Sequence, residues 1–226
     1  MKYSLPGGAF FGANMFLFFS ALRHVSIATI TLVGVLQPII VTLVAARLFG
    51  ERITRWWVAW TSVAIVGVAA AVLLAGKAVR ATPFGLLLAI SCTVCLAAYL
   101  VASREARRTL GAGEYLAGVM LWAAILLSIP LVFQGLHLNE LDAKDWMLMG
   151  AILIGPGWIG HLLLNWAITE IPMSITSLQM LPSTVISVAV AWPVNNEPVT
   201  FAQAVAGLVT LVAVAMILHG PFRRAV

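Results

Sequence analysis

Few side chains of this chain could do chemistry inside its long apolar segments. Trp158, His161 and Asn165 follow one another at i, i+3 and i+7, so a helix would place all three on one face. Thiols aside, His161 is the only titratable side chain well inside an apolar segment, which makes it a candidate for a proton-sensitive role. The other interpretation, which we favour, is a histidine that hydrogen-bonds a neighbouring helix.

Prolines mark three places where membrane helices would be interrupted. Gln37-Pro38, residues 155–157 (Gly-Pro-Gly) and Leu181-Pro182 each lie near the middle of an apolar segment. Interrupted helices free backbone carbonyls and amides, which can contact a solute near the membrane midplane. For each proline alone, a simple packing kink explains the sequence equally well.

Amides, hydroxyls and aromatic rings accompany these prolines. Asn14 has phenylalanines nearby, and Gln179 shares a polar stripe with Thr176 and Ser183. A cavity lined by such groups suits an amphipathic or zwitterionic organic solute better than a bare ion. The candidate substrate-binding residues are Asn14, Gln37, Pro38, Trp158, His161, Asn165, Gln179 and Pro182.

Signatures of enzymes and of metal sites are missing from the sequence. It contains no glycine-rich phosphate loop with its lysine, no Ser/His/Asp set and no carboxylate cluster for hydrolysis. Cys92 and Cys95 form a C-x-x-C pattern within one apolar segment, without a second pair elsewhere. Two thiols are too few for a metal site, so we interpret them as packing residues and expect no catalytic function, cofactor or metal.

The elements that must position these residues are membrane helices. Of the 226 residues, 62% are hydrophobic and 9% are charged, whereas a soluble domain has about 25% charged residues. A crossing needs about 20 apolar residues, which limits the chain to about nine crossings. Continuous apolar blocks such as 56–76 exclude the alternating pattern of a β-barrel, so we predict an all-α integral membrane protein in a lipid bilayer.

Charged residues fall only at the ends of apolar blocks or between them, as their cost within a bilayer requires. Cutting the chain at these charges predicts eight transmembrane helices, at 7–22, 25–49, 56–76, 83–102, 115–133, 146–168, 172–194 and 201–218.

The distribution of cations predicts the orientation. Nine lysines and arginines fall on one side of the eight crossings and four on the other. The positive-inside rule therefore places both termini in the cytoplasm. The net charge of +5 follows from this bias, so we infer no nucleic-acid partner from it.

Two similar segments occur 146 residues apart. Residues 51–54 (Glu-Arg-Ile-Thr) superpose on residues 197–200 (Glu-Pro-Val-Thr), and each follows a helix that contains a proline. Five predicted helices separate the two copies, so they face opposite sides of the membrane, as in the inverted repeats of secondary transporters. For Glu51 and Glu197 themselves we expect a role in capping or salt-bridging a helix end rather than in coupling transport.

These segments, together with others in order, resemble the EamA repeat of the drug/metabolite transporter superfamily. Residues 21–28, Gln37-Pro38, 50–54 and 65–68 resemble the second half of one repeat. Residues 165–174, Leu181-Pro182 and 197–200 resemble the same half of a second repeat, and 84–104 resembles its opening helix.

The resemblance implies a fold of two inverted five-helix repeats, ten helices in all. Three predicted helices precede the second repeat here, so we expect an incomplete 3+5 version that lacks the first two helices. The two parts would be 1–78, a partial first repeat, and 83–220, a complete second repeat.

The function implied is a secondary transporter in the inner membrane that works by alternating access, as an exporter of small organic metabolites, amino acids or drugs. Its site would lie between the helices at 25–49, 146–168 and 172–194. The sequence leaves open whether transport would be uniport, exchange or proton-coupled transport through His161. The alternative is a truncated, non-transporting scaffold or assembly partner, and Gly8-x-x-x-Gly12 could then form the face of a homodimer.

Overall fold

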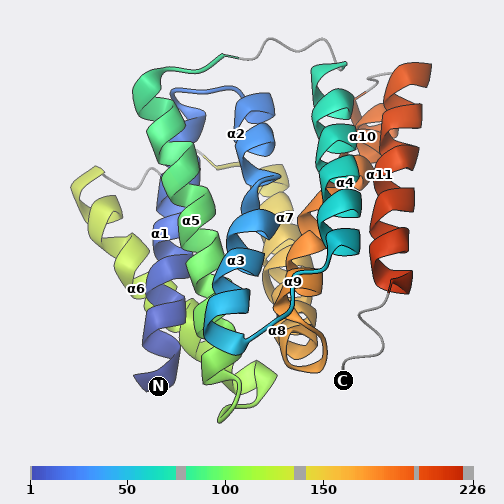
Figure 1. Ribbon diagram of the computed structural model, residues 1–226. Coiled ribbons are helices and arrows are strands. Elements are labelled where there is room, and N and C mark those ends of the chain that lie inside the picture. The colour runs from blue at the N-terminus through green and yellow to red at the C-terminus, as the bar shows by residue number, and fades with distance from the viewer. Residues whose placement is uncertain (1, 75–79, 135–140, 196–198, 221–226) are drawn as a thin grey trace.

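The computed structural model describes residues 2–74, 80–134, 141–195 and 199–220, and in this part of the chain the regular elements are all helical (Figure 1). The α-helices are α1 (Leu5–Leu22), α2 (Ile27–Gly34), α3 (Gln37–Phe49), α4 (Arg55–Leu73), α5 (Pro83–Ala106), α6 (Ala112–Gln134), α7 (Ala143–Ile152), α8 (His161–Glu170), α9 (Met173–Thr176), α10 (Met180–Asn195) and α11 (Phe201–His219). A π-helix, Leu153–Gly160, joins α7 to α8, and a 3-10 turn, Ser177–Gln179, joins α9 to α10.

Seven segments are long and apolar enough to cross a membrane, which confirms an all-α membrane protein. They match seven of the predicted spans in order, with α2 and α3 forming one segment (Ile27–Phe49) and α7, the π-helix and α8 forming another (Ala143–Glu170). The remaining predicted span, 172–194, is divided into α9, the 3-10 turn and α10.

The predicted interruptions of these helices occur one turn before a proline in each case. A proline ring clashes with the carbonyl of the residue four positions earlier. For Pro38 that residue is Gly34, where α2 ends, and for Pro182 it is Leu178, inside the 3-10 turn. For Pro156 it is Ile152, where α7 gives way to the π-helix. The sequence prediction of three broken helices is therefore confirmed.

Polar side chains fix where five of the helices begin. Ser26, Thr54, Thr82, Asp142 and Thr200 each accept a hydrogen bond from the backbone N–H three residues later. These residues satisfy donors that the first turn of a helix leaves unpaired.

Glycines allow α1 to lie close to α6. A Cβ added to Gly8 would overlap Trp122 Cβ and approach the backbone oxygen of Val119 to 3.0 Å, and one added to Gly12 would lie 3.3 Å from Ala123 Cα. The expectation that Gly8-x-x-x-Gly12 forms a dimer face is therefore wrong. The motif is used inside the chain, because α6 supplies the close-packing partner.

The helices α4 and α11 form a second close pair, at the opposite edge of the bundle from α6 (Figure 1). Trp56, at the start of α4, donates a hydrogen bond of 2.9 Å to the carbonyl of Met216, near the end of α11. Midway along the pair, Thr210 Oγ1 lies 3.5 Å from the carbonyl oxygen of Ala64. The two helices therefore run antiparallel.

By contrast, α7 and the π-helix contain no buried residue. Large apolar side chains point outward in consecutive positions, including Met147, Ile152 and Leu153. Residues 146–159, which we call the open segment, therefore lack the helical cover that α1 receives from α5 and α6.

The start of α1 and the end of α11 lie at the same end of the bundle (Figure 1), together with Arg104 and Arg107 near the end of α5. We call this the arginine-rich end. Glu197 and three of the cations that predict the orientation, Lys77, Arg223 and Arg224, lie outside the described residues.

Candidate functional site

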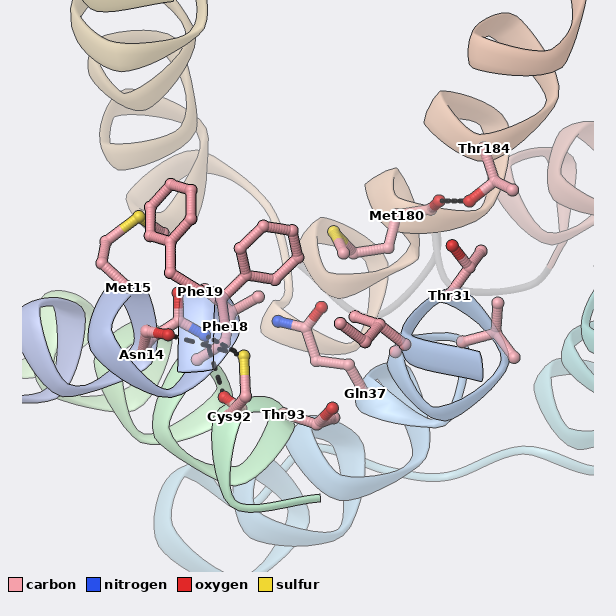
Figure 2. A pocket seen from close by; sticks show the side chains of 14 residues that line it. Asn14, Met15, Phe18, Phe19, Thr31, Gln37, Cys92, Thr93, Met180 and Thr184 are labelled. Atoms are coloured by element: carbon pink, nitrogen blue, oxygen red, sulfur yellow. Dashed lines mark hydrogen bonds between the residues drawn. The ribbon is translucent and has the colours of Figure 1, made fainter. Parts of the chain in front are cut away.

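The candidate site is a partly open cavity of about 320 Å³ that lies between helices from both parts of the chain. Figure 2 shows its walls, which come from α1, from α2 and α3 on either side of their interruption, from α5 and from the start of α10. The lining residues are Asn14, Met15, Phe18, Phe19, Ile30, Thr31, Gly34, Val35, Gln37, Cys92, Thr93, Leu96, Met180 and Thr184.

Most of the polar groups in these walls already have partners within the protein. Asn14 donates through its amide nitrogen to the carbonyl oxygen of Cys92 at 2.9 Å and to Cys92 Sγ at 3.1 Å. The hydroxyls of Thr31, Thr93 and Thr184 donate to backbone carbonyls four residues earlier in their own helices. Their hydrogens are therefore used, and the lone pairs of the hydroxyl oxygens remain as acceptors.

Gln37 is the exception. It is 1% exposed, and its Oε1 has no hydrogen-bond partner. The residue starts α3, and its amide points into the cavity between Phe18 and Met180 (Figure 2). An unpaired amide oxygen in such a place costs free energy, and a ligand that donates a hydrogen bond would remove that cost.

A polar cluster lies one turn from the cavity, toward the arginine-rich end. Asn165 is 0% exposed and donates to Tyr99 Oη and to the carbonyl of His161, both at 2.8 Å. Tyr99 Oη also lies 3.4 Å from His161 Nδ1, and the ring of Phe11 packs edge-on against His161. The cluster joins α1, α5 and α8, so His161 has the interhelical role that we favoured from the sequence.

The structure distributes the eight predicted site residues over several places. Asn14 and Gln37 line the cavity, with buried Pro38 next in the chain. His161 and Asn165 belong to the polar cluster, which is not part of the cavity wall. Residues of α1 and α5 occupy the position that we expected for the helix at 146–168.

The predicted common face of Trp158, His161 and Asn165 is wrong with respect to Trp158. Trp158 is 62% exposed, whereas Asn165 is fully buried. The reason is the π-helix, whose turns contain more residues than those of an α-helix and so rotate Trp158 away from the face that His161 and Asn165 share.

Gln179 and Pro182 lie in a separate outer groove of about 480 Å³ between α8, α10 and α11. The 3-10 turn before α10 again changes the direction of the side chains, so Gln179 faces away from Met180 and Thr184. Sequence reasoning missed Thr93 and Thr184. Each hydroxyl lies close to a serine in a mostly apolar helix, Ser91 and Ser183 respectively, and these short polar clusters were the available signal.

At the arginine-rich end, Glu51, just after α3, forms hydrogen bonds and an ion pair with the second half of the chain. Its carboxylate accepts hydrogen bonds from the backbone N–H groups of Met173, at 2.7 Å, and Ser174, at 3.1 Å. Arg104 lies 3.5 Å from the same carboxylate. The expected capping and salt-bridging role of Glu51 is confirmed.

Replacing Glu51 by alanine should lower the free energy of unfolding by about 2 kcal/mol, because two N–H groups at the start of α9 lose a charged acceptor. Thermal unfolding in detergent micelles measures the change. The matched control is Glu105→Ala, which removes a carboxylate paired with Arg108 at an exposed site and should cost less than about 0.5 kcal/mol. Equal effects of the two substitutions would contradict the assignment.

Comparison with known proteins gives a family match and matches to solved structures. The model of the EamA-like transporter family matches residues 83–219. A protein of known crystal structure, described only as a protein, superposes with a TM-score of 0.81 at 24% sequence identity, over 96% of this chain and 75% of that one. No curated protein sequence matches the chain. The crystal structure supports the fold, and the family model covers more than half of the chain.

Proposed function

The chain belongs to the EamA-like transporter family, and on that basis we propose that it is a secondary transporter that exports small organic molecules by alternating access. The observation that carries this proposal is the cavity. It is lined by α1, α2, α3, α5 and α10, and of the described residues that line it none is charged. Sites near the midplane, beside interrupted helices, are typical of secondary transporters.

Contacts at the arginine-rich end support a state that is closed on that side. Beyond the cavity come the polar cluster and then the bonds from Glu51 to α9 and Arg104. Arg107 adds a hydrogen bond of 3.0 Å to the carbonyl of Asn165. Separating these contacts while closing the opposite side would give the second state of an alternating-access cycle.

The α4–α11 pair supports an inverted repeat. Ala64 and Thr210, which meet midway along the pair, are 146 residues apart in the sequence. The same separation relates Glu51 to Glu197. A two-fold axis in the membrane plane would bring equivalent residues together in this way.

Inner-membrane insertion with both termini in the cytoplasm is part of the proposal, supported by the cation count along the chain. Uniport, exchange and proton coupling through His161 remain alternatives for the energy source. Measuring flux with and without an imposed proton gradient separates them.

Transport is tested in proteoliposomes. The purified full chain is reconstituted, loaded with a mixed pool of neutral, cationic and anionic metabolites, and efflux is followed by mass spectrometry against protein-free vesicles. We expect selective efflux of a subset of the pool. No efflux of any compound above the protein-free rate would refute the proposal.

The open segment favours a second candidate function, that of an assembly partner. Among the spans that the structure describes, Ala143–Glu170 has 6% of its most apolar part buried, against 28–39% in each of the other six. This span therefore packs against the rest of the chain far less than the others do. We propose a second copy of this chain as the occupant, so that two open segments pack against each other in a homodimer.

Disulfide cross-linking in native membranes tests the homodimer. In a background with Cys92→Ala and Cys95→Ala, Leu153→Cys should form a cross-linked dimer under mild oxidation. Val66→Cys on α4 is the matched control, because Leu153 is 66% and Val66 67% exposed. Cross-linking of both variants to the same extent, or of neither, would contradict a dimer at this surface.

A further inference from the structure

We infer that the cavity selects neutral, largely apolar molecules that carry a carboxamide-like group, with a hydrogen-bond donor and an acceptor, and that the side-chain amide of Gln37 binds this group. The inference rests on the proposed function, because it names the substrate class of the same cavity. Three features of the walls carry it: their charge, their hydrogen-bonding balance and their size.

The first feature is the absence of charge among the described lining residues. A carboxylate or ammonium ligand would lose its water shell without gaining an ion pair, which is expensive in an apolar site. Arg23, four residues after Phe19, is exposed and is not part of the lining. Arg104 and Arg107, at the arginine-rich end, are bonded to Glu51, to carbonyls of α8 and to the carbonyl of Leu110. A charged solute therefore has no counter-charge in this cavity.

The second feature is an unpaired amide. The amide hydrogens of Asn14 are bound to Cys92, and the hydroxyls of Thr93 and Thr184 donate to carbonyls of their own helices. Gln37 is different, because among the described residues neither its Oε1 nor its Nε2 has a hydrogen-bond partner. A ligand with both a donor and an acceptor, such as a carboxamide, can pair the two halves of this amide.

The third feature is the apolar part of the lining and its size. Phe18 and Phe19 pack edge-to-face with ring centroids 5.5 Å apart, and Met15 and Met180 contribute flexible thioethers. A volume of about 320 Å³ is at the small end for ligand sites. The occupant is therefore compact, on the scale of one or two fused rings with a short polar arm.

The burial of Gln37 is what distinguishes a binding role from a structural one. A buried amide kept for stability is bonded within the protein through at least one of its halves. Gln203 Oε1 accepts hydrogen bonds from the backbone N–H and the hydroxyl of Thr200, and Asn165, whose oxygen is unpaired, donates to Tyr99 Oη and to the carbonyl of His161. Gln37 has neither kind of bond, and it lines the cavity. Replacing an unpaired buried polar group by an apolar group of the same shape is neutral or stabilising.

Three probes that share one ring system test the selectivity: naphthalene-1-acetamide, naphthalene-1-acetate and 2-(naphthalen-1-yl)ethylammonium. Their binding to the purified full chain in neutral detergent is measured by ligand-observed NMR, with empty micelles subtracted. We expect the amide to bind about tenfold more tightly than either charged probe, the factor that about 1.4 kcal/mol of unmatched desolvation produces. Equal or tighter binding of a charged probe would overturn the inference.

Two matched variants then assign the effect to Gln37. Gln37→Met should abolish the preference for the amide and leave the melting temperature unchanged or raised. Gln203→Met should lower the melting temperature and keep the preference. A melting temperature lowered by Gln37→Met, or a preference that survives it, would overturn the role of Gln37.

The outcomes also separate this inference from the proposed function. Efflux of charged metabolites combined with preferential binding of a charged probe would leave transport standing and refute the substrate class. Amide-selective binding without efflux of any compound would support the substrate class and refute transport.

Discussion

Replacing Gly8 by leucine should prevent α1 from packing against α6 and lower the free energy of unfolding by at least about 3 kcal/mol. The added side chain has no room, because even a Cβ at this position overlaps Trp122 and crowds the backbone oxygen of Val119. A backbone atom cannot move aside without shifting the whole of α6. The measurement is the yield of monodisperse protein and its melting temperature in detergent.

Gly150→Leu is the matched control, since it makes the same change inside α7. Nothing lies within 4 Å of a Cβ added at Gly150, and leucine forms helices better than glycine does by roughly 0.5–1 kcal/mol. We expect this variant to be as stable as the parent protein or slightly more stable. A Gly8→Leu protein that unfolds at the same temperature as the control would show that α1 and α6 are not in close contact.

Replacing Tyr99 by alanine should cost about 3–5 kcal/mol, the range for removing a large buried aromatic side chain. Tyr99 is fully buried, and its ring packs 5.3 Å, centroid to centroid, from that of Phe11. Its hydroxyl accepts the hydrogen bond from Asn165. The substitution therefore opens a void where α1, α5 and α8 meet and leaves the Asn165 amide partly unpaired.

Two further variants show which part of Tyr99 matters. Tyr99→Phe keeps the ring and should cost only about 1 kcal/mol, the typical value of one hydrogen bond. Tyr3→Ala removes an exposed tyrosine from the start of the chain and should change stability by less than about 0.5 kcal/mol. Similar melting temperatures for Tyr99→Ala and Tyr3→Ala would contradict the packing described here.

The sequence predicted the membrane helices and their interruptions because both depend on strong local effects. A charge within the bilayer is costly, so charges mark the ends of spans. A proline disturbs the carbonyl four residues earlier wherever it occurs in a helix, which is why Pro38, Pro156 and Pro182 located the breaks.

Which faces of the helices meet could not be predicted in the same way. In lipid, the outer face of a helix is as apolar as its packed face, so hydrophobic periodicity does not distinguish them. Close packing depends instead on small residues, and Gly8 alone does not specify whether its partner is α6 or a second molecule. The contact with α6 required the three-dimensional structure.

The candidate site was predicted in part for the same reason. Asn14 and Gln37 were found because amides are rare in apolar segments, and both line the cavity. Trp158 and Gln179 were assigned to the site by assuming regular α-helical turns. The π-helix and the 3-10 turn change the number of residues per turn, so both side chains point elsewhere.

The thiol of Cys92, which accepts a hydrogen bond from Asn14 in the cavity wall, can be labelled chemically to report on the state of the cavity. Of the two cysteines in the chain, Cys92 is the one that lines the cavity. A small, membrane-impermeant maleimide or methanethiosulfonate can reach its sulfur only when the cavity is open to the compartment that contains the reagent. Labelling from one side and then from the other would record which side is open without introducing any substitution. Fragmentation in the mass spectrometer must distinguish Cys92 from Cys95, which lies on the same peptide and is more exposed.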